Sequence, residues 1–224
     1  MYIIYNMFNN CNSKQNGEYK FFIDIKDKIN HIFDVGSNSD SEFIEFTGEV
    51  HYFDPVNEFI EKLKTKENMN KASYFNNFGL GEDNKELYYY PKYQSFYDRI
   101  NSCSVSDNSN KIILHIKKGK DYVISNNIKN IDFLKIDTEG YELNVLQGFE
   151  DYLEIVKIIQ FEYGGTFLDT NTKLIDVINY LEQKGFYKFS YLTNYGTKLI
   201  TDFTDHYQYC NIVCINKNSN FVPF

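Results

Sequence analysis

Carboxylates gather directly after one apolar segment in the middle of the chain. Residues 131–136 read Ile-Asp-Phe-Leu-Lys-Ile, which indicates a buried strand, and Asp137, Glu139 and Glu142 follow it. Open α/β folds bind ligands at the carboxyl edge of the sheet, so these acids are expected where chemistry is done. A carboxylate at that edge can accept a proton or bind a cation. Glu142 is also placed to stabilise the dipole of the following helix.

A fourth carboxylate ends the next apolar segment, residues 156–161. Glu162 lies in the stretch Gln-Phe-Glu-Tyr-Gly-Gly that closes this predicted strand. If the two strands are parallel neighbours, Asp137 and Glu162 could share a proton or a divalent cation such as Mg²⁺. The alternative is a pair of solvated carboxylates at the edge of the sheet.

Two features earlier in the chain suit a nucleotide-like ligand. The stretch FDVGSNSD, residues 33–40, follows an apolar segment, and Gly36 allows a sharp bend and the close approach of a ligand. Asp54 ends the next predicted strand, 20 positions after Asp34, where a carboxylate can accept hydrogen bonds from two ribose hydroxyls. An ordinary turn capped by Ser39, and an Asp54 that merely caps a helix, are the structural alternatives.

The histidines divide into two groups. His31 and His51 fall inside predicted strands and are interpreted as packing residues. His115 and His206 fall in segments with no clear pattern, so each is a candidate general base.

The elements that must position these residues alternate between short apolar runs and amphipathic stretches, the pattern of βαβ units in a mostly parallel sheet. The sequence therefore predicts an α/β fold. Strands are expected at 30–35, 50–53, 72–78, 131–136, 156–161, 187–193 and 208–216, with helices at 40–46, 56–66, 141–152 and 172–184. We also expect an extra strand at 86–90 and a polar loop or lid at 104–110.

Composition limits the classes of partner and the cellular compartment that are expected for this chain. The chain has 224 residues with no linker-like segment, so one domain is expected, and its net charge of −8 without a basic stripe disfavours nucleic acid. No run of 18 apolar residues and no signal-peptide pattern is present, so no membrane association is predicted. Cys210 and Cys214 would lie about 13 Å apart on one strand, too far to bridge, which favours reduced thiols and a cytoplasmic location.

In their order, these motifs resemble the FkbM family of S-adenosylmethionine-dependent methyltransferases. The matching segments, over roughly residues 30–190, are FDVGSN, HYFDPVNEFI, NFGLGE, IDFLKIDTEGYELNVLQGFE, IIQFEY and LIDVINYLEQKGF. The resemblance implies a class I methyltransferase (Rossmann-like) fold, with a mostly parallel seven-stranded sheet, an antiparallel last strand and helices on both faces. It also implies O-methylation of a hydroxyl on a small molecule, most often a sugar or glycan. Residues 1–29 would be an extension packed on a core of 30–193, and 194–224 would supply the antiparallel strand.

The same resemblance assigns residues to the cofactor, S-adenosylmethionine. Asp54 would accept the ribose hydroxyls and Asp137 would face the methionine moiety. The other cofactor-binding positions would be Asp34, Gly36, Ser37 and Asn38 on the methionine and ribose side, and Asn77, Gly79 and Leu80 near the adenine. Because the hydroxyl must lose its proton, Glu162, Glu139 and His115 are the candidate bases, and Mg²⁺ at Asp137 and Glu162 is the alternative means of activation.

The chain departs from the family pattern at one position of the first loop. Asp40 stands where the family usually has a second glycine, and the first helix is reduced to a short stub. An aspartate there would repel the cofactor's carboxylate, at a cost of about 1 kcal/mol, unless its side chain turns away.

Two other functions are weighed against methyl transfer. Tyr180 with Lys184, and Tyr88 with Lys92, have the Tyr-x-x-x-Lys spacing of NAD-dependent short-chain oxidoreductases, but the glycine-rich dinucleotide turn is missing. A catalytically inactive binding module of the same fold is the other alternative, which the Asp40 departure permits. The oligomeric state is left open.

Overall fold

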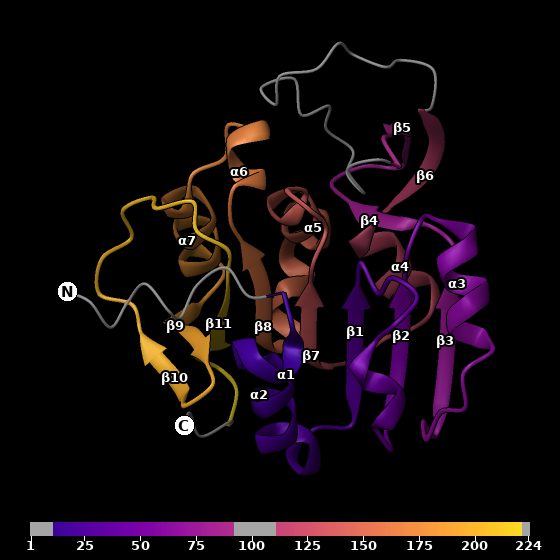
Figure 1. Ribbon diagram of the computed structural model, residues 1–224, viewed down its shortest axis with the longest axis horizontal. Helices are drawn as coiled ribbons and strands as arrows, with labels where there is room; N and C mark the ends of the chain where they lie inside the picture. Colours follow the sequence, from indigo (N-terminus) through magenta and orange to yellow (C-terminus); the bar gives the residue numbers. More distant parts are fainter. Residues whose placement is uncertain (1–10, 92–110, 221–224) are drawn as a thin grey trace.

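The protein is an α/β structure built on one large, mostly parallel sheet with helices on both faces (Figure 1). The computed structural model describes residues 11–91 and 111–220. The strands of the large sheet, in spatial order, are β10 (Gly196–Leu199), β9 (Phe186–Thr193), β11 (Cys210–Asn216), β8 (Val156–Tyr163), β7 (Ile131–Ile136), β1 (His31–Val35), β2 (Glu49–Phe53) and β3 (Ala72–Asn76). A second, small sheet has the order β4 (Gly79–Gly81), β6 (Ile112–Lys118) and β5 (Lys85–Tyr89).

The helices connect these strands and cover the sheet. They are α1 (Ser13–Asn16), α2 (Glu18–Ile25), α3 (Asn57–Lys64), α4 (Gly119–Ser125), α5 (Glu142–Phe149), α6 (Thr166–Asp169) and α7 (Leu174–Gln183). Short 3-10 helices are η1 (Lys26–Lys28), η2 (Glu42–Glu45) and η4 (Glu150–Ile155). No helix in these described parts of the chain is both long and apolar enough to cross a bilayer.

The strand directions place several carboxyl ends at one edge of the large sheet. β3, β2, β1, β7 and β8 run parallel to their neighbours, whereas β11 is antiparallel to both β8 and β9. The sheet has eight strands and not seven, because the chain after β9 turns back at Asn194 and Tyr195 to add the antiparallel edge strand β10. The antiparallel strand near the C-terminus was predicted, and β10 was not.

Most predicted elements are confirmed to within a few residues. Residues 131–136 form β7 as expected, and the extra strand expected at 86–90 is β5 in the small sheet. The helix expected at 40–46 is only the 3-10 turn η2. Strand β6 and helix α4 were missed, and the loop expected at 104–110 lies outside the described residues.

The sheet separates two apolar cores. On one face, Phe21, Phe22 and Ile25 of α2 pack on the strands beside Ile32 and Phe133. On the other face, α4, α5 and α7 cover a larger cluster (Figure 1), which includes Phe33, Leu134, Leu146, Phe161 and Ile178. Neighbouring strand residues thus point to opposite cores, as the two-residue repeat of a strand requires.

His51, predicted to be a packing residue, and the two cysteines predicted not to bridge are all buried. His51 is 5% exposed, stacks on Tyr74 and shares a 2.7 Å hydrogen bond between its Nδ1 and the Tyr122 hydroxyl. Cys210 and Cys214 lie on β11 with free, buried thiols, as their spacing predicted.

Candidate functional site

A cavity of about 520 Å³ opens at the carboxyl edge of the large sheet. The loops that follow β1, β2 and β7 line it, together with Glu162 of β8, strand β4 and residues from the N-terminal segment. Predicted site residues that line it are Gly36, Ser37, Asn38, Asp54, Gly79, Leu80, Asp137, Glu139 and Glu162. The structure therefore brings segments that are far apart in sequence to one site.

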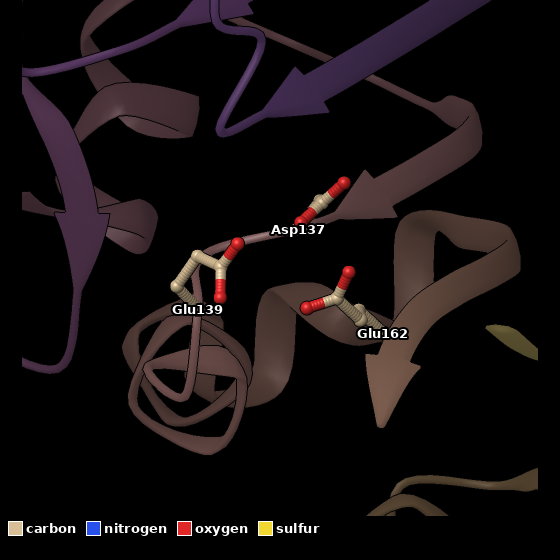
Figure 2. Close-up of side chains that lie close together, drawn as sticks. All are labelled: Asp137, Glu139 and Glu162. Carbon is tan, nitrogen blue, oxygen red and sulfur yellow. The ribbon is translucent and has the colours of Figure 1, made fainter. Parts of the chain in front are cut away.

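Three carboxylates converge inside this cavity. Figure 2 shows Asp137 at the end of β7, Glu139 in the loop after it, and Glu162 near the end of β8, with their carboxylates turned toward one another. One oxygen of each lies within 4.8 Å of the others. Burial, together with the negative charges of Asp137 and Glu139, raises the pKa of Glu162 well above its ordinary value. Tyr209 donates a hydrogen bond to the same carboxylate. A buried carboxyl group whose pKa is perturbed in this way is a candidate for proton transfer at the site.

Glu142 holds the loop that carries Glu139. Its Oε1 accepts hydrogen bonds from the backbone N–H of Thr138 at 2.9 Å and of Gly140 at 3.2 Å. Between these two anchors Glu139 adopts a left-handed backbone with φ of 53°. Glu142 lies in the first turn of α5 as expected, its effect on the helix dipole stays a prediction, and its side chain fixes the conformation from which Glu139 reaches Glu162.

The loop after β1 passes very close to the loop after β7. Gly36 has φ of 83°, and a Cβ there would lie 1.8 Å from the carbonyl oxygen of Asp137. The sequence suggested that a glycine here makes room for a ligand. The structure shows that the backbone contact with Asp137 already requires a glycine at this position. Ser37 beside it is 3% exposed, lines the cavity, and its Oγ has no hydrogen-bond partner among the described residues. A buried unpaired hydroxyl on a cavity wall fits a polar ligand group.

Asp54 is held rigidly at the end of β2. Its Oδ2 accepts from the backbone N–H of Asn38 at 3.0 Å, and its Oδ1 from that of Val56 at 2.8 Å. The side chain is 6% exposed, and burial raises its pKa to about 6 despite these bonds. Each carboxylate oxygen keeps a second lone pair, so a bound diol can still donate to it.

Two predicted cofactor residues do not line the cavity. Asp34 is buried and accepts a 2.6 Å hydrogen bond from the Ser41 hydroxyl. Asn77 is exposed, and its Nδ2 donates to the carbonyl oxygens of Asp54 at 3.3 Å and Pro55 at 3.1 Å. Both residues shape the loops and do not face the cavity.

His115 is the candidate base that the structure does not bring to the site. It lies on β6 with its side chain 69% exposed, 3.5 Å from Glu86 Oε1 and away from the residues that line the cavity. The strand around it was not recognised in the sequence, so its exposure could not be foreseen. His206 is likewise outside the cavity lining, and its Nε2 lies 3.1 Å from the Tyr191 hydroxyl.

Lys135 is the main site residue that sequence reasoning missed. It lines the cavity at 8% exposure, with its Nζ 3.2 Å from Asp137 Oδ2 and 3.9 Å from Asp34 Oδ1. Burial works against its charge, but the surrounding carboxylates raise its pKa well above the ordinary value. The sequence feature that could have revealed Lys135 is a lysine inside an otherwise apolar run. A charge is stable in such a buried position only when it is paired.

The features that counted against a methyltransferase do not occupy the interior of the cavity. Asp40 stands at the cavity rim, but its carboxylate is 87% exposed and pairs with Lys66, so it has turned away from the cavity interior. Tyr180 on α7 and Lys184 directly after it do not line the cavity; the Tyr180 hydroxyl donates to the Leu146 carbonyl oxygen at 3.4 Å, and Lys184 pairs with Asp151 at 2.8 Å. Tyr88 is 51% exposed on the small sheet, and Lys92 lies outside the described residues.

Comparison with known proteins agrees with this geometry. No protein with a curated description matches the chain. The Methyltransferase FkbM domain matches residues 34–187, more than two thirds of the chain, and this range includes the loops after β1, β2, β7 and β8. The chain belongs to the FkbM methyltransferase family.

Proposed function

We propose that the protein transfers a methyl group from S-adenosylmethionine to a hydroxyl of a small molecule, and that this acceptor is a sugar or glycan. The observation that carries this proposal is the meeting of Asp54, Ser37 and the Asp137–Glu139–Glu162 cluster in one cavity of a family member. The sheet supports the same view: its order from β3 to β9 fits a class I methyltransferase core with β10 added at the edge.

The residues near β1 and β2 suit the donor. Asp54 is fixed by two backbone N–H groups and has lone pairs left for two ribose hydroxyls. The unpaired Ser37 Oγ offers a hydrogen bond to a polar group of the methionine moiety. When bound, S-adenosylmethionine would supply a positively charged sulfonium as the methyl source, and Asp137 lies where a negative charge would favour it.

Glu162 is the residue we propose as the general base, with Glu139 as the second candidate. An alcohol becomes a good nucleophile only as its proton leaves, and the Glu162 carboxylate lines the cavity, where it can receive that proton. The hydrogen bond from Tyr209 holds it in place. The chain's contribution is then orientation of the two reactants and removal of one proton.

A divalent cation is the second candidate partner of the same three carboxylates. Their oxygens are close enough together to bind one ion, and bound Mg²⁺ would acidify the acceptor hydroxyl. Lys135 already supplies a positive charge 3.2 Å from Asp137, which favours the metal-free proposal. Activity that survives a chelator supports the carboxylate base, and activity lost with the chelator and restored by Mg²⁺ supports the metal.

Labelled methyl transfer tests the proposed function. The protein is incubated with S-adenosylmethionine labelled on its methyl group and a panel of glycans, sugars and simple alcohols. Label in a hydroxyl-bearing product supports the proposal, and a protein that does not bind S-adenosylmethionine rejects it.

The net charge of −8 and the acidic cavity support a substrate other than nucleic acid, and the free thiols of β11 support a reducing compartment such as the cytoplasm.

A further inference from the structure

Part of the cavity is built by residues outside the family domain. The family match begins at residue 34 and ends at 187, yet Asn12, Ser13 and Glu18 from the N-terminal segment and Tyr209 before β11 all line the cavity. Residues 1–29 were expected to be an extension packed on the core. Residues 12–18 do more than pack, because they complete a wall of the site.

A tightly packed turn between α1 and α2 places Glu18 in this wall. Gly17 has φ of 102°, and a Cβ there would lie 2.5 Å from the backbone nitrogen of Thr193, so the turn sits directly on β9. Glu18 follows as the first residue of α2 and is only 5% exposed. Its Oε2 accepts a 2.6 Å hydrogen bond from Asn16 Nδ2, and its Oε1 a 2.8 Å bond from Gln160 Nε2.

Glu18 thereby joins a row of buried polar side chains across the sheet. Asp34, Lys135 and Gln160 are direct register partners on β1, β7 and β8, and all three are buried. Asn211 on β11 extends the row, since its Oδ1 accepts a 3.1 Å hydrogen bond from Gln160 Nε2. Of this row, Glu18 and Lys135 line the cavity, so Glu18 has a fixed place in the cavity wall beside Lys135.

Glu18 lies in the half of the cavity that is left for the acceptor. In the proposed function, the donor occupies the side near Asp54 and Ser37, at the ends of β2 and β1. Glu18 lies on the side of β8, whose residues Gln160 and Glu162 point to the same face of the strand. An acceptor that places its hydroxyl against Glu162 therefore meets the wall that Glu18 and Tyr209 form.

Charge sets a limit on that acceptor. On the side of β7 and β8, the described lining contains four carboxylates, Glu18, Asp137, Glu139 and Glu162, against the single cation Lys135. Lys135 is already engaged by Asp137 at 3.2 Å. A phosphate or carboxylate on the acceptor would lose its hydration and meet like charges, which costs several kcal/mol in such sites.

We propose that Glu18 is an acceptor-binding residue and that the acceptor is a hydroxyl compound without negative charge, neutral or amine-bearing. This inference rests on the proposed function. The hydroxyl oxygen forms a bond to the methyl carbon, the carbon–sulfur bond breaks with its electron pair going to sulfur, and the hydroxyl proton passes to Glu162. Glu18 accepts a hydrogen bond from another hydroxyl or an ammonium group of the acceptor and holds it for this attack.

Three acceptor pools test the inference. Each pool contains monosaccharides, oligosaccharides and simple alcohols, and the pools differ in charge: neutral, amine-bearing, or bearing phosphate or carboxylate. Label from S-adenosylmethionine should enter the neutral or amine-bearing pool only. Glu18→Gln should lower that rate at least tenfold, as expected for a lost bond to a charged group, while calorimetric affinity for S-adenosylmethionine stays within threefold. Asp24→Asn removes an exposed carboxylate from the same helix and should leave the rate within twofold.

Each contrary result has a separate meaning. The inference is overturned if label enters the anionic pool, or if Glu18→Gln leaves the rate unchanged. It is also overturned if Asp24→Asn loses as much rate as Glu18→Gln, or if a protein that binds S-adenosylmethionine labels neither the neutral nor the amine-bearing pool. A wild-type protein that does not bind S-adenosylmethionine rejects the proposed function instead. If Glu18→Gln does not fold, Glu18→Asp retains the charge but withdraws it by one methylene, and it should still lower the rate; a wild-type rate in Glu18→Asp overturns the inference.

Discussion

Replacing Glu142 with glutamine would remove a buried charge while keeping the loop anchored. The Oε1 atom accepts from the Thr138 backbone at 2.9 Å, the Thr138 hydroxyl at 3.1 Å and the Gly140 backbone at 3.2 Å, and an amide oxygen can accept the same bonds. The Oε2 atom is buried with no partner among the described residues. The substitution therefore exchanges an ionisable group for a neutral one of the same shape.

The size of the effect follows from the pKa of Glu142. Burial, only partly offset by its backbone hydrogen bonds, raises that pKa from 4.5 to about 7. Because the folded value is the higher one, its stabilising contribution is complete below pH 4.5 and is lost as the pH rises through 7. At about 1.4 kcal/mol per pKa unit the full range is about 3 kcal/mol, of which about 2 kcal/mol falls between pH 5.5 and 8.0.

Urea denaturation of wild type and Glu142→Gln at pH 5.5 and 8.0 measures this difference. At pH 5.5 the variant is expected to be the less stable protein by about 1–3 kcal/mol, because its amide N–H₂ lacks a partner. From pH 5.5 to 8.0 the wild type should lose about 2 kcal/mol more of its free energy of unfolding than the variant. Other buried acids such as Glu18 and Asp54 titrate in both proteins, so the difference reports Glu142 together with the effect of its charge on Glu162.

The control is Glu182→Gln, which changes an exposed glutamate on α7. Its free energy of unfolding should follow the wild-type pH dependence. If Glu142→Gln also follows the wild-type curve, Glu142 does not titrate differently in the folded and unfolded states, and the argument from its burial is refuted.

Three further substitutions probe the site. Asp54→Ala should weaken S-adenosylmethionine binding by about 1.5–3 kcal/mol in calorimetry, and unchanged affinity in a folded variant would reject the ribose role. Gly36→Ala should destabilise the fold by about 3 kcal/mol or more in urea denaturation, because its Cβ would lie 1.8 Å from Asp137 O, and a wild-type midpoint would contradict that contact. Glu162→Gln should lower methyl transfer at least about 100-fold with donor affinity retained, whereas a rate near wild type would transfer the role of base to Glu139.

The sheet was largely predictable because its strands carry local signals. Residues 131–136 and 156–161 are apolar runs that end in carboxylates, and both form parallel neighbours with those carboxylates at one edge. Strand β6 was missed because its residues alternate irregularly and are mostly exposed, which removes the period-two signal. His115 was misplaced as a candidate base for the same reason.

The site was predictable only where its residues end strands. Lys135 and Gln160 lie inside apolar runs, and their meaning depends on register across β1, β7 and β8, which no single segment reveals. Glu18 is more distant still, because its partner Gln160 is 142 positions away and the contact depends on how α2 docks on the sheet. Long-range pairing of this kind follows from tertiary packing and not from local pattern.

Titration of the wild-type protein with S-adenosylmethionine in a calorimeter tests the central claim most directly. The cavity that Asp54, Ser37 and Asp137 line predicts saturable binding at one site per chain, with NAD⁺ giving no saturable heat under the same conditions. Absence of saturable binding by S-adenosylmethionine in a folded sample would contradict the methyltransferase proposal and favour a binding module that keeps only the fold.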